Sequence, residues 1–206
     1  HRGPDGSGFW SNEDFGIYFG HRRLSIIDLS ENGSQPFQSN SSRYIITFNG
    51  EIYNYHNLKK DINIPLKGNS DTEILVEYIE KFGIDKTLKE IKGMFAFALW
   101  DNQDESLILC RDRMGEKPLY YGLQNNVFMF SSELKSLKFH PQFDKTINKN
   151  ALSKYFTYGY IPAPMSIYKN IYKLLPGHYL KIDYNIFKND TSYKFEPVKY
   201  WSYTKK

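Results

Sequence analysis

Cysteine is nearly absent from the sequence: Cys110 stands alone among 206 residues. A single cysteine cannot form an internal disulfide, which is typical of proteins in a reducing compartment, and we expect the cytoplasm. No apolar run approaches the roughly 18 residues that span a membrane, and no secretory signal peptide is visible. These absences argue against an integral membrane protein and against a secreted domain held together by disulfides.

Clusters of like charge are missing as well. The net charge is only +4, and no stretch carries a long run of one sign. A nucleic-acid-binding surface needs Lys and Arg gathered on one face, so we expect no nucleic-acid partner, although the mixture of Lys and Tyr in the C-terminal part keeps this alternative open. The histidines lack the spacing of metal ligands, so we predict no metal site.

Aromatic residues, in contrast, are abundant. Hydrophobic residues make up 40% of the chain and aromatic residues 17%, which is typical of a globular domain with a core rich in Tyr and Phe. Short apolar segments bounded by turn residues predict strands, and several of these strands follow one another as hairpins. The predicted strands are 16–20, 24–29, 43–48, 94–100, 106–110, 119–123, 127–131 and 179–183.

Helical patterns lie between these strands. Ser70 and Glu73 form a capping box, and apolar residues follow at helical spacing as far as Phe82. Hairpin-linked strands with helices grouped between them predict an α+β fold with mainly antiparallel sheets sandwiched by helices. The chain turns polar from Tyr184, so residues 184–206 are predicted to be a linker. Shorter helices are predicted at 53–61, 86–91, 133–138 and 150–158.

The segment ITFNGEIYNY, residues 46–55, has two interpretations. Asn49-Gly50 directly after a strand is the strongest short signal of a hairpin turn. Alternatively, the strand ends by presenting a polar tip, with Glu51 beside it, to a ligand.

Three polar groups together suit one kind of ligand. Arg23 has the guanidinium fork that grips a carboxylate, although an exposed surface arginine is the simpler interpretation. Asp71 suits an ammonium group, although an acid at a helix start needs no ligand. With the amide and backbone donors of Asn49-Gly50, these groups would bind an α-amino acid whose side chain carries a carbonyl.

Six motifs occur in an order that is specific to one family. They are HRGPDG (1–6), GHRRLSIIDLS (20–30), FNGEIYN (48–54), SDTE (70–73), GMFAFALWD (93–101) and RDRMGEKPLYY (111–121). Together they resemble the glutaminase domain of class II glutamine amidotransferases, in the form found in bacterial glutamine-hydrolysing asparagine synthetases. The resemblance spans residues 1–183, and it implies an N-terminal-nucleophile hydrolase fold, an αββα sandwich.

The resemblance also implies a role for each site residue. Glutamine would be hydrolysed to glutamate and ammonia, with the Asn49 side-chain amide and the Gly50 backbone N–H as the oxyanion hole. Arg23 would hold the carboxylate of glutamine, Asp71 would hold its ammonium, and Glu51 would help to position it. The site would also be lined by Leu24, Ser25, Ile26 and Ile27.

The nucleophile of this family is a cysteine at the mature N-terminus, and its own α-amino group acts as the base. The sequence begins at HRGPDG, so we expect that this segment is missing and that the chain is part of a longer, two-domain enzyme. Cys110 lies within an apolar strand and is expected to be a buried, inert thiol rather than a replacement. The fragment alone is therefore expected to be inactive.

In the complete enzyme, the resemblance implies ATP-dependent amidation of aspartate to asparagine. The glutaminase domain would need no cofactor, ATP and Mg²⁺ would belong to the absent synthetase domain, and a homodimer is one assembly to test. Two alternatives stay open: an amidotransferase with a different acceptor in surface-polysaccharide synthesis, and a non-catalytic glutamine-binding module. The sequences that flank this chain would separate them.

Overall fold

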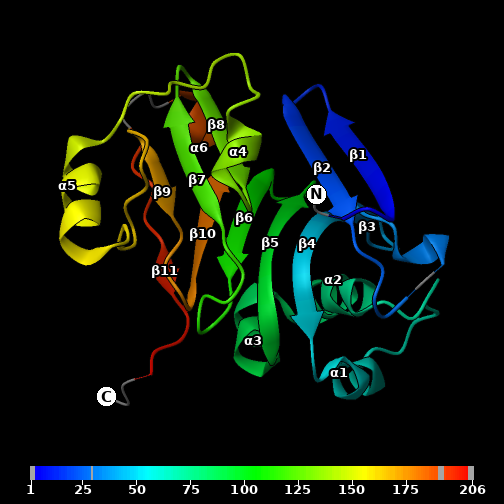
Figure 1. Ribbon diagram of the computed structural model, residues 1–206. Coiled ribbons are helices and arrows are strands. Elements are labelled where there is room, and N and C mark those ends of the chain that lie inside the picture. The colour runs from blue at the N-terminus through cyan, green and yellow to red at the C-terminus, as the bar shows by residue number, and fades with distance from the viewer. Residues whose placement is uncertain (1–2, 29, 190–192, 204–206) are drawn as a thin grey trace.

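The computed structural model describes residues 3–28, 30–189 and 193–203 (Figure 1). Its strands are β1 Gly6–Asn12, β2 Ile17–Arg23, β3 Phe37–Gln38, β4 Tyr44–Ile52, β5 Gly93–Asp101, β6 Ser106–Arg111, β7 Tyr120–Gln124, β8 Val127–Ser131, β9 Ile171–Lys173, β10 His178–Asp183 and β11 Val198–Lys199. Its helices are α1 Tyr55–Asp61, α2 Asp71–Phe82, α3 Ile84–Glu90, α4 Leu134–Leu137, α5 Lys149–Tyr158 and α6 Tyr184–Asn189, with a 3₁₀ turn at Glu31–Gly33.

An antiparallel six-stranded sheet forms the centre of the molecule, in the order β11-β10-β6-β5-β4-β3. Successive side chains of a strand point to opposite faces, and both faces of this sheet are covered. Along β5 the buried residues therefore alternate between two cores, with Phe95, Phe97 and Leu99 in one and Ala96, Ala98 and Trp100 in the other.

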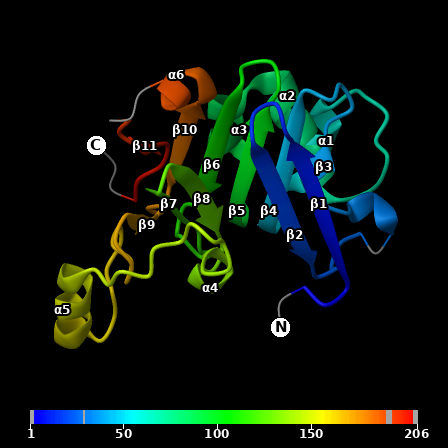
Figure 2. The same cartoon turned by 90° about the horizontal axis from the view of Figure 1, so that it is seen from above.

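Helices α1, α2 and α3 cover one face of the six-stranded sheet (Figures 1 and 2). Helix α2 begins where the capping box predicted, because Ser70 Oγ accepts a hydrogen bond from the Glu73 backbone N–H at 3.1 Å. It ends at Gly83, whose φ of 78° lies in the region that favours glycine. The buried start of α2 thus stands at a fixed place beside β4.

Two smaller sheets cover the other face of the six-stranded sheet (Figure 2). One is the β1-β2 hairpin and the other is the three-stranded sheet β8-β7-β9. Helix α4 packs on the outer side of β8, where Met129 and Leu137 share a third core. The layers are helix, sheet, sheet and helix, and the α+β sandwich with antiparallel sheets is confirmed.

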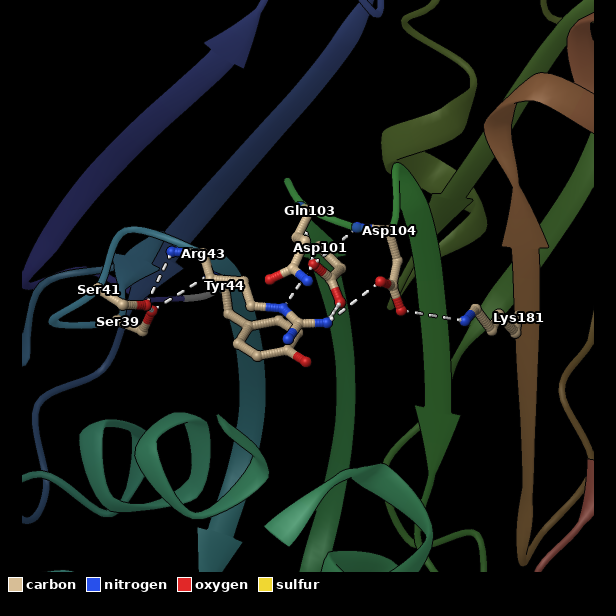
Figure 3. Close-up of polar contacts among 8 residues, drawn as sticks. All are labelled: Ser39, Ser41, Arg43, Tyr44, Asp101, Gln103, Asp104 and Lys181. Carbon is tan, nitrogen blue, oxygen red and sulfur yellow. Dashed lines mark hydrogen bonds and ion pairs between the residues drawn. The ribbon is translucent and has the colours of Figure 1, made fainter. Parts of the chain in front are cut away.

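A charged cluster fastens one end of the six-stranded sheet (Figure 3). Arg43 donates from Nε and Nη2 to the two carboxylate oxygens of Asp101, at 2.9 and 2.7 Å. Asp104 joins Arg43 at 3.3 Å and Lys181 at 3.7 Å. Because Arg43 precedes β4, Asp101 ends β5 and Lys181 lies on β10, the cluster ties together strands that are distant in sequence.

Around the expected site, the structure excludes one of the two interpretations of residues 46–55 and corrects the strand predicted at 24–29. Asn49-Gly50 is not a hairpin turn, because β4 continues through it to Ile52 and pairs with β5 along its length. A Cβ at Gly50 would lie 2.1 Å from the Met94 carbonyl oxygen, so this glycine serves close strand packing. Residues 24–28 form a loop rather than a strand, and Leu29 lies outside the described residues.

The segment 184–203 packs on the domain as far as it is described. Helix α6 follows β10 directly, and Tyr184 and Phe187 pack against the second core. Strand β11 pairs with the start of β10. The assignment of 184–206 as a linker stays a prediction. Among the described residues, no helix has the length and apolar character needed to cross a membrane.

Candidate active site

A cavity of about 160 Å³ opens where the end of β2, the end of β4 and the start of α2 meet. It is smaller than the roughly 300–1,000 Å³ pockets of drug-sized ligands and suits a small polar molecule. The structure brings all nine residues predicted for the site into its lining. They are Arg23, Leu24, Ser25, Ile26, Ile27, Asn49, Gly50, Glu51 and Asp71.

The guanidinium of Arg23 is held by the loop that follows β2. Its Nη1 donates to the Ser30 carbonyl at 2.8 Å, and its Nη2 donates to the Asp28 carbonyl. Both bonds go to main-chain oxygens, and they use two of the five N–H donors that a guanidinium carries. Arg23 is therefore oriented by neutral partners and retains donors for a carboxylate.

Asp28 ties this loop to the start of α2. Its carboxylate accepts from the Ser30 hydroxyl at 2.6 Å, the Ser30 backbone N–H at 2.8 Å and the Asn69 backbone N–H at 3.0 Å. These hydrogen bonds, led by the Ser30 hydroxyl, lower the pKa of Asp28, so it is a carboxylate at neutral pH. Asn69 lies just before α2, so its hydrogen bond to Asp28 holds the loop after β2 against the start of this helix. Arg23 and Asp71 therefore line the same cavity.

The side chain of Asp71 is buried at the first position of α2. Its Oδ2 accepts a hydrogen bond from the Ile52 backbone N–H at 2.9 Å. Burial raises the pKa of Asp71, and backbone hydrogen bonds from Ile52 and Thr72 oppose this. Asp71 has no cationic partner among the residues that the structure describes, and such a buried carboxylate gains most from a ligand that brings positive charge into the cavity.

Asn49 stands between the two sheet layers. Its Nδ2 donates to Ser132 Oγ at 3.1 Å, and Ser132 directly follows β8. The amide is thus directed away from the helical layer, on the face of β4 that it shares with Thr47. Gly50, one residue further, contributes its backbone to the lining of the smaller cavity.

The lining carries both signs of charge at once. Arg23 and Lys117 supply cations, whereas Asp28, Glu51 and Asp71 supply carboxylates. No group of three or more His, Cys, Asp or Glu in the described ranges could hold a metal ion. A zwitterionic molecule with a polar side chain is the ligand class that this mixture complements.

Sequence reasoning missed several residues of the cavity. His21 donates from Nε2 to the Phe48 carbonyl at 3.2 Å, so it braces β4 one residue before Asn49. Burial lowers the pKa of His21, and the nearby Arg23 lowers it further, which keeps the ring neutral. Its position two residues before Arg23 on β2 was the available signal, because alternate residues of a strand share a face.

Gln35 and Lys117 also line the cavity, and of the two only Lys117 lies in one of the six sequence motifs, 111–121. Gln35 accepts from the Phe48 backbone N–H at 2.6 Å and donates to Thr72 Oγ1 at 3.2 Å, which bridges β4 and α2. The backbone of Lys117 is clamped, since its N–H donates to Asp112 and its carbonyl accepts from Arg111. These residues come from loops whose placement depends on long-range contacts.

A second and larger cavity, of about 1260 Å³, adjoins the first. It lies over β4 and β5, between residues of β2 and residues of β8. The small side chains of Ala96 and Ala98 contribute to its floor. Five residues line both cavities and mark their junction: His21, Leu24, Phe48, Asn49 and Lys117.

Cys110 lies outside both cavities. Its side chain is fully buried on β6, in the core beneath the helices. Burial raises the pKa of its thiol well above the usual value, which suppresses the nucleophilic thiolate. The prediction of a buried thiol is confirmed, and its inertness stays a prediction.

Solved structures share this fold. A glutamine phosphoribosylpyrophosphate amidotransferase from Bacillus subtilis, complexed with ADP and GMP, superimposes with a TM-score of 0.59 and 20% identity, over 88% of this chain and 34% of that one. A structure described as the allosteric regulatory enzyme of purine biosynthesis gives a TM-score of 0.57 over the same shares. The fold is that of the N-terminal-nucleophile hydrolases.

A family model described as a glutamine amidotransferase domain matches residues 1–195, and the chain belongs to this family. A putative glutamine-hydrolysing asparagine synthetase 2 of Methanocaldococcus jannaschii is 41% identical over 84% of this chain and 37% of its own length. Glutamine-hydrolysing asparagine synthetase 1 of Bacillus subtilis is 40% identical over 96% of this chain and 32% of its length. The chain thus spans about a third of these relatives.

Proposed function

We propose that this chain is the glutamine-hydrolysing domain of an asparagine synthetase. It would convert glutamine to glutamate and ammonia. The observation that carries the proposal is the meeting of Arg23, Asp71 and Asn49 in one small cavity. They come from β2, α2 and β4 and offer a cation, an anion and an amide donor to one ligand.

The proposed pose of glutamine follows from charge. Its α-carboxylate lies against the free donors of Arg23, and its ammonium lies against Asp71, whose negative charge it compensates. Glu51, beside Gly50 on β4, helps to hold the ammonium end. The side-chain amide of glutamine then extends toward the junction with the larger cavity, where Asn49 lies.

The reaction needs a nucleophile that the described residues do not supply at this junction. We propose that a cysteine on a segment preceding residue 1 enters the larger cavity between β2 and β8. Its α-amino group would take the proton of the thiol as the sulfur attacks the amide carbon, and would later give that proton to the departing nitrogen. The carbonyl oxygen becomes an oxyanion bound by Asn49 Nδ2 and the Gly50 N–H. Collapse releases ammonia, and water then cleaves the thioester to give glutamate.

The rest of the activity would belong to polypeptide outside this chain. There, ATP and Mg²⁺ would activate aspartate, which the ammonia converts to asparagine. The names of the relatives support this acceptor. The single cysteine of the chain, which can form no internal disulfide, supports the reducing cytoplasm as the place of action. The complete enzyme would act as a homodimer.

A relative with a different name keeps a second acceptor open. A protein named amidase chry2 of Gibberella zeae is 36% identical over 87% of this chain and 26% of its own length. The relatives that match this chain are therefore not all named asparagine synthetase. A different acceptor, such as a sugar in surface-polysaccharide synthesis, would leave the glutamine cavity unchanged.

The test is glutamate release from L-glutamine by the complete protein and by its Arg23→Met variant. We expect hydrolysis in the first and a KM for glutamine raised about 10–100-fold in the second, because hydrogen bonds to charged groups contribute about 1.5–3 kcal/mol. Binding of glutamine without glutamate release would instead identify a non-catalytic module. Neither binding nor release would refute both functions.

A further inference from the structure

Strand β4 has an open edge beside the candidate site, because β3 is two residues long and pairs with it near its start. The main-chain groups of successive strand residues point to opposite edges. Ile52 donates its N–H to Asp71 on the open side, so Phe48 and Gly50 also direct their main-chain groups to this side. Within the described part of the chain, no strand pairs with β4 at these two residues on that edge.

Two side chains hold the main chain of Phe48 where a neighbouring strand would otherwise do so. Gln35 Oε1 accepts a hydrogen bond from the Phe48 N–H at 2.6 Å, and His21 Nε2 donates to the Phe48 carbonyl at 3.2 Å. An antiparallel strand makes the same pair of contacts, one with an N–H and one with a carbonyl. We call Gln35 and His21 the Phe48 clamp. The carbonyl that His21 binds belongs to the peptide unit that leads into Asn49, so the clamp fixes the approach to this residue.

The two residues of the Phe48 clamp are brought together by β1. The register of β1 and β2 pairs His21 with Gly8. The Gln35 carbonyl packs against the same glycine, where a Cβ would lie 1.9 Å from the oxygen. The main chain at Gln35 therefore lies against the β1-β2 hairpin, and its side chain reaches back to β4. Gln35 Nε2 also donates to Thr72 Oγ1 at 3.2 Å, which ties the clamp to the buried start of α2.

The imidazole of His21 occupies its place at an energetic cost. A carbonyl oxygen can only accept, so Nε2 carries the proton and Nδ1 is an acceptor. Nδ1 is buried and has no hydrogen-bond partner among the described residues. A buried acceptor without a partner is unfavourable, so the contact from Nε2 to Phe48 is the feature that compensates for it.

Gly50 lies between two held points of the open edge. The Phe48 clamp holds one of them, Asp71 holds the other at Ile52, and each is two residues from Gly50. The Gly50 N–H points to the same edge, beside the smaller cavity that this residue lines. A glycine has no side chain that packing could fix, so the orientation of its N–H depends on these neighbours.

We propose that His21 and Gln35 are positioning residues for glutamine hydrolysis, because they hold β4 so that Asn49 and Gly50 face the developing oxyanion. This inference rests on the proposed function and adds to it two residues that act through the main chain of Phe48. Oxyanion donors stabilise a transition state because they are preorganised, so a strand end that moves would weaken both donors at once. The consequence is a loss of kcat rather than a loss of glutamine binding.

Steady-state kinetics of the complete protein test the proposal. Gln35→Met and His21→Leu should each lower kcat for glutamine hydrolysis about 10–100-fold, since small displacements of catalytic groups have effects of this size. KM should change less than about threefold, because Arg23 and Asp71 still hold the charged groups of glutamine. Gln38→Met is the matched control, because Gln38 is exposed on β3 outside both cavities, and it should behave as wild type. An unchanged kcat, or a raised KM at normal kcat, would overturn the proposal.

His21→Gln separates positioning from a general loss of structure. The side-chain amide of glutamine can still donate to the Phe48 carbonyl, so this variant should keep most of the kcat that His21→Leu loses. The double variant with Gln35→Met and His21→Leu should be little slower than the slower single variant, because both side chains act on one residue. If His21→Gln is as slow as His21→Leu while both unfold at the wild-type temperature, the donor is not needed and the proposal is wrong.

Amide hydrogen exchange of the complete protein measures the clamp without any turnover. In Gln35→Met the Phe48 N–H loses its acceptor, so peptides that contain residues 47–50 should exchange about tenfold faster than in wild type, as in a locally opened strand. Gln38→Met should leave this exchange unchanged. A wild type that releases no glutamate would refute the proposed function and with it the catalytic part of this inference. Unchanged exchange in Gln35→Met, in a protein that hydrolyses glutamine, would refute the clamp alone.

Discussion

Asp71 accepts a hydrogen bond from the backbone N–H of Ile52 at 2.9 Å. This bond joins the first residue of α2 to the last residue of β4. It places a buried carboxylate two residues along the strand from Gly50, in the cavity that also contains Arg23. The relationship couples the helical layer to the strand end on which the proposed chemistry depends.

Asp71→Asn should raise the KM for glutamine about tenfold or more, because a neutral amide cannot pair with the ammonium. Ammonia-dependent synthesis by the complete protein should persist, since ammonia needs no glutamine site. Asp85→Asn is the matched control, because Asp85 also lies in the first turn of a helix but is exposed outside the cavity. Equal loss of both activities in Asp71→Asn would refute the assignment.

Asp71→Asn should weaken glutamine binding without lowering the stability of the folded protein. The pKa of Asp71 is raised in the folded protein, so stability falls as pH rises from the unfolded value of about 3.9 to the folded pKa and stays lowered above it. Asp71→Asn removes this penalty, and its amide oxygen can still accept from Ile52. Thermal unfolding at pH 7 should therefore show an unchanged or higher Tm, and a clear decrease would contradict the burial argument.

Asn49→Ala should lower kcat for glutamine hydrolysis about 10²–10³-fold, as removal of one oxyanion donor does elsewhere. Glutamine affinity should change much less, because the donor acts on charge that develops in the transition state. Steady-state kinetics of the complete protein separate these effects. Asn57→Ala, on the exposed face of α1, should behave as wild type. An unchanged kcat in Asn49→Ala would remove Asn49 from the oxyanion hole.

Acid should weaken the contact between Arg43 and Asp101 (Figure 3). Burial favours a higher pKa for Asp101, but hydrogen bonds from Arg43 and from two backbone N–H groups outweigh it and leave the pKa below its usual value. The contribution of Asp101 is therefore fully present above the unfolded pKa of about 3.9 and is lost as pH falls through the lower folded pKa.

Asp101→Asn should consequently cost about 2 kcal/mol of unfolding free energy at pH 7, the loss of charged hydrogen bonds at a partly exposed arginine. The cost should shrink below pH 4 or so, where the wild type loses the same charge. Denaturant unfolding at several pH values measures both effects. Asp104→Asn, at a half-exposed pair, should cost less than about 1 kcal/mol. A pH-independent cost for Asp101→Asn would contradict the explanation.

Cys110→Ala should leave glutamine hydrolysis by the complete protein unchanged, because the thiol lies in the core under the helices, away from both cavities. The folded wild type should react with a thiol reagent at Cys110 only after unfolding, since the raised pKa and burial suppress the thiolate. Peptide mapping after labelling measures this. Loss of hydrolysis with an intact fold would make Cys110 part of the chemistry.

The sequence predicted the elements that local signals define. Helix α2 has its cap, its apolar spacing and its closing Gly83 within fourteen residues, and it was placed correctly. The hairpin of β5 and β6 was also predicted, because both strands are strongly apolar. Such signals are independent of the rest of the chain.

Long-range pairing explains what the sequence could not predict. Asn49-Gly50 has the composition of a turn, but pairing with β5 keeps it extended, and only the close approach of Met94 reveals why a glycine is present. Strand β1 was missed because its residues GSGFWSN lack β-branched side chains and, within the described part of the chain, it pairs with β2 alone. Local propensity loses to tertiary contacts in both cases.

The residues of the site divide in the same way, into those that the sequence motifs identify and those placed by long-range contacts. The family resemblance named nine residues, and the structure gathers them in one cavity. His21 and Gln35 were not named, because their contacts with the Phe48 backbone cross 27 and 13 residues of sequence. Gln35 leaves no local pattern, and the only signal for His21 was its position two residues before Arg23.

The most direct test of the glutaminase assignment is a crystal structure of the complete protein with its product, L-glutamate. The account predicts density in the smaller cavity, with the α-carboxylate on the Arg23 guanidinium, the ammonium on Asp71 and the side chain directed toward Asn49. Glutamate bound at another place, in a protein that hydrolyses glutamine, would contradict the account.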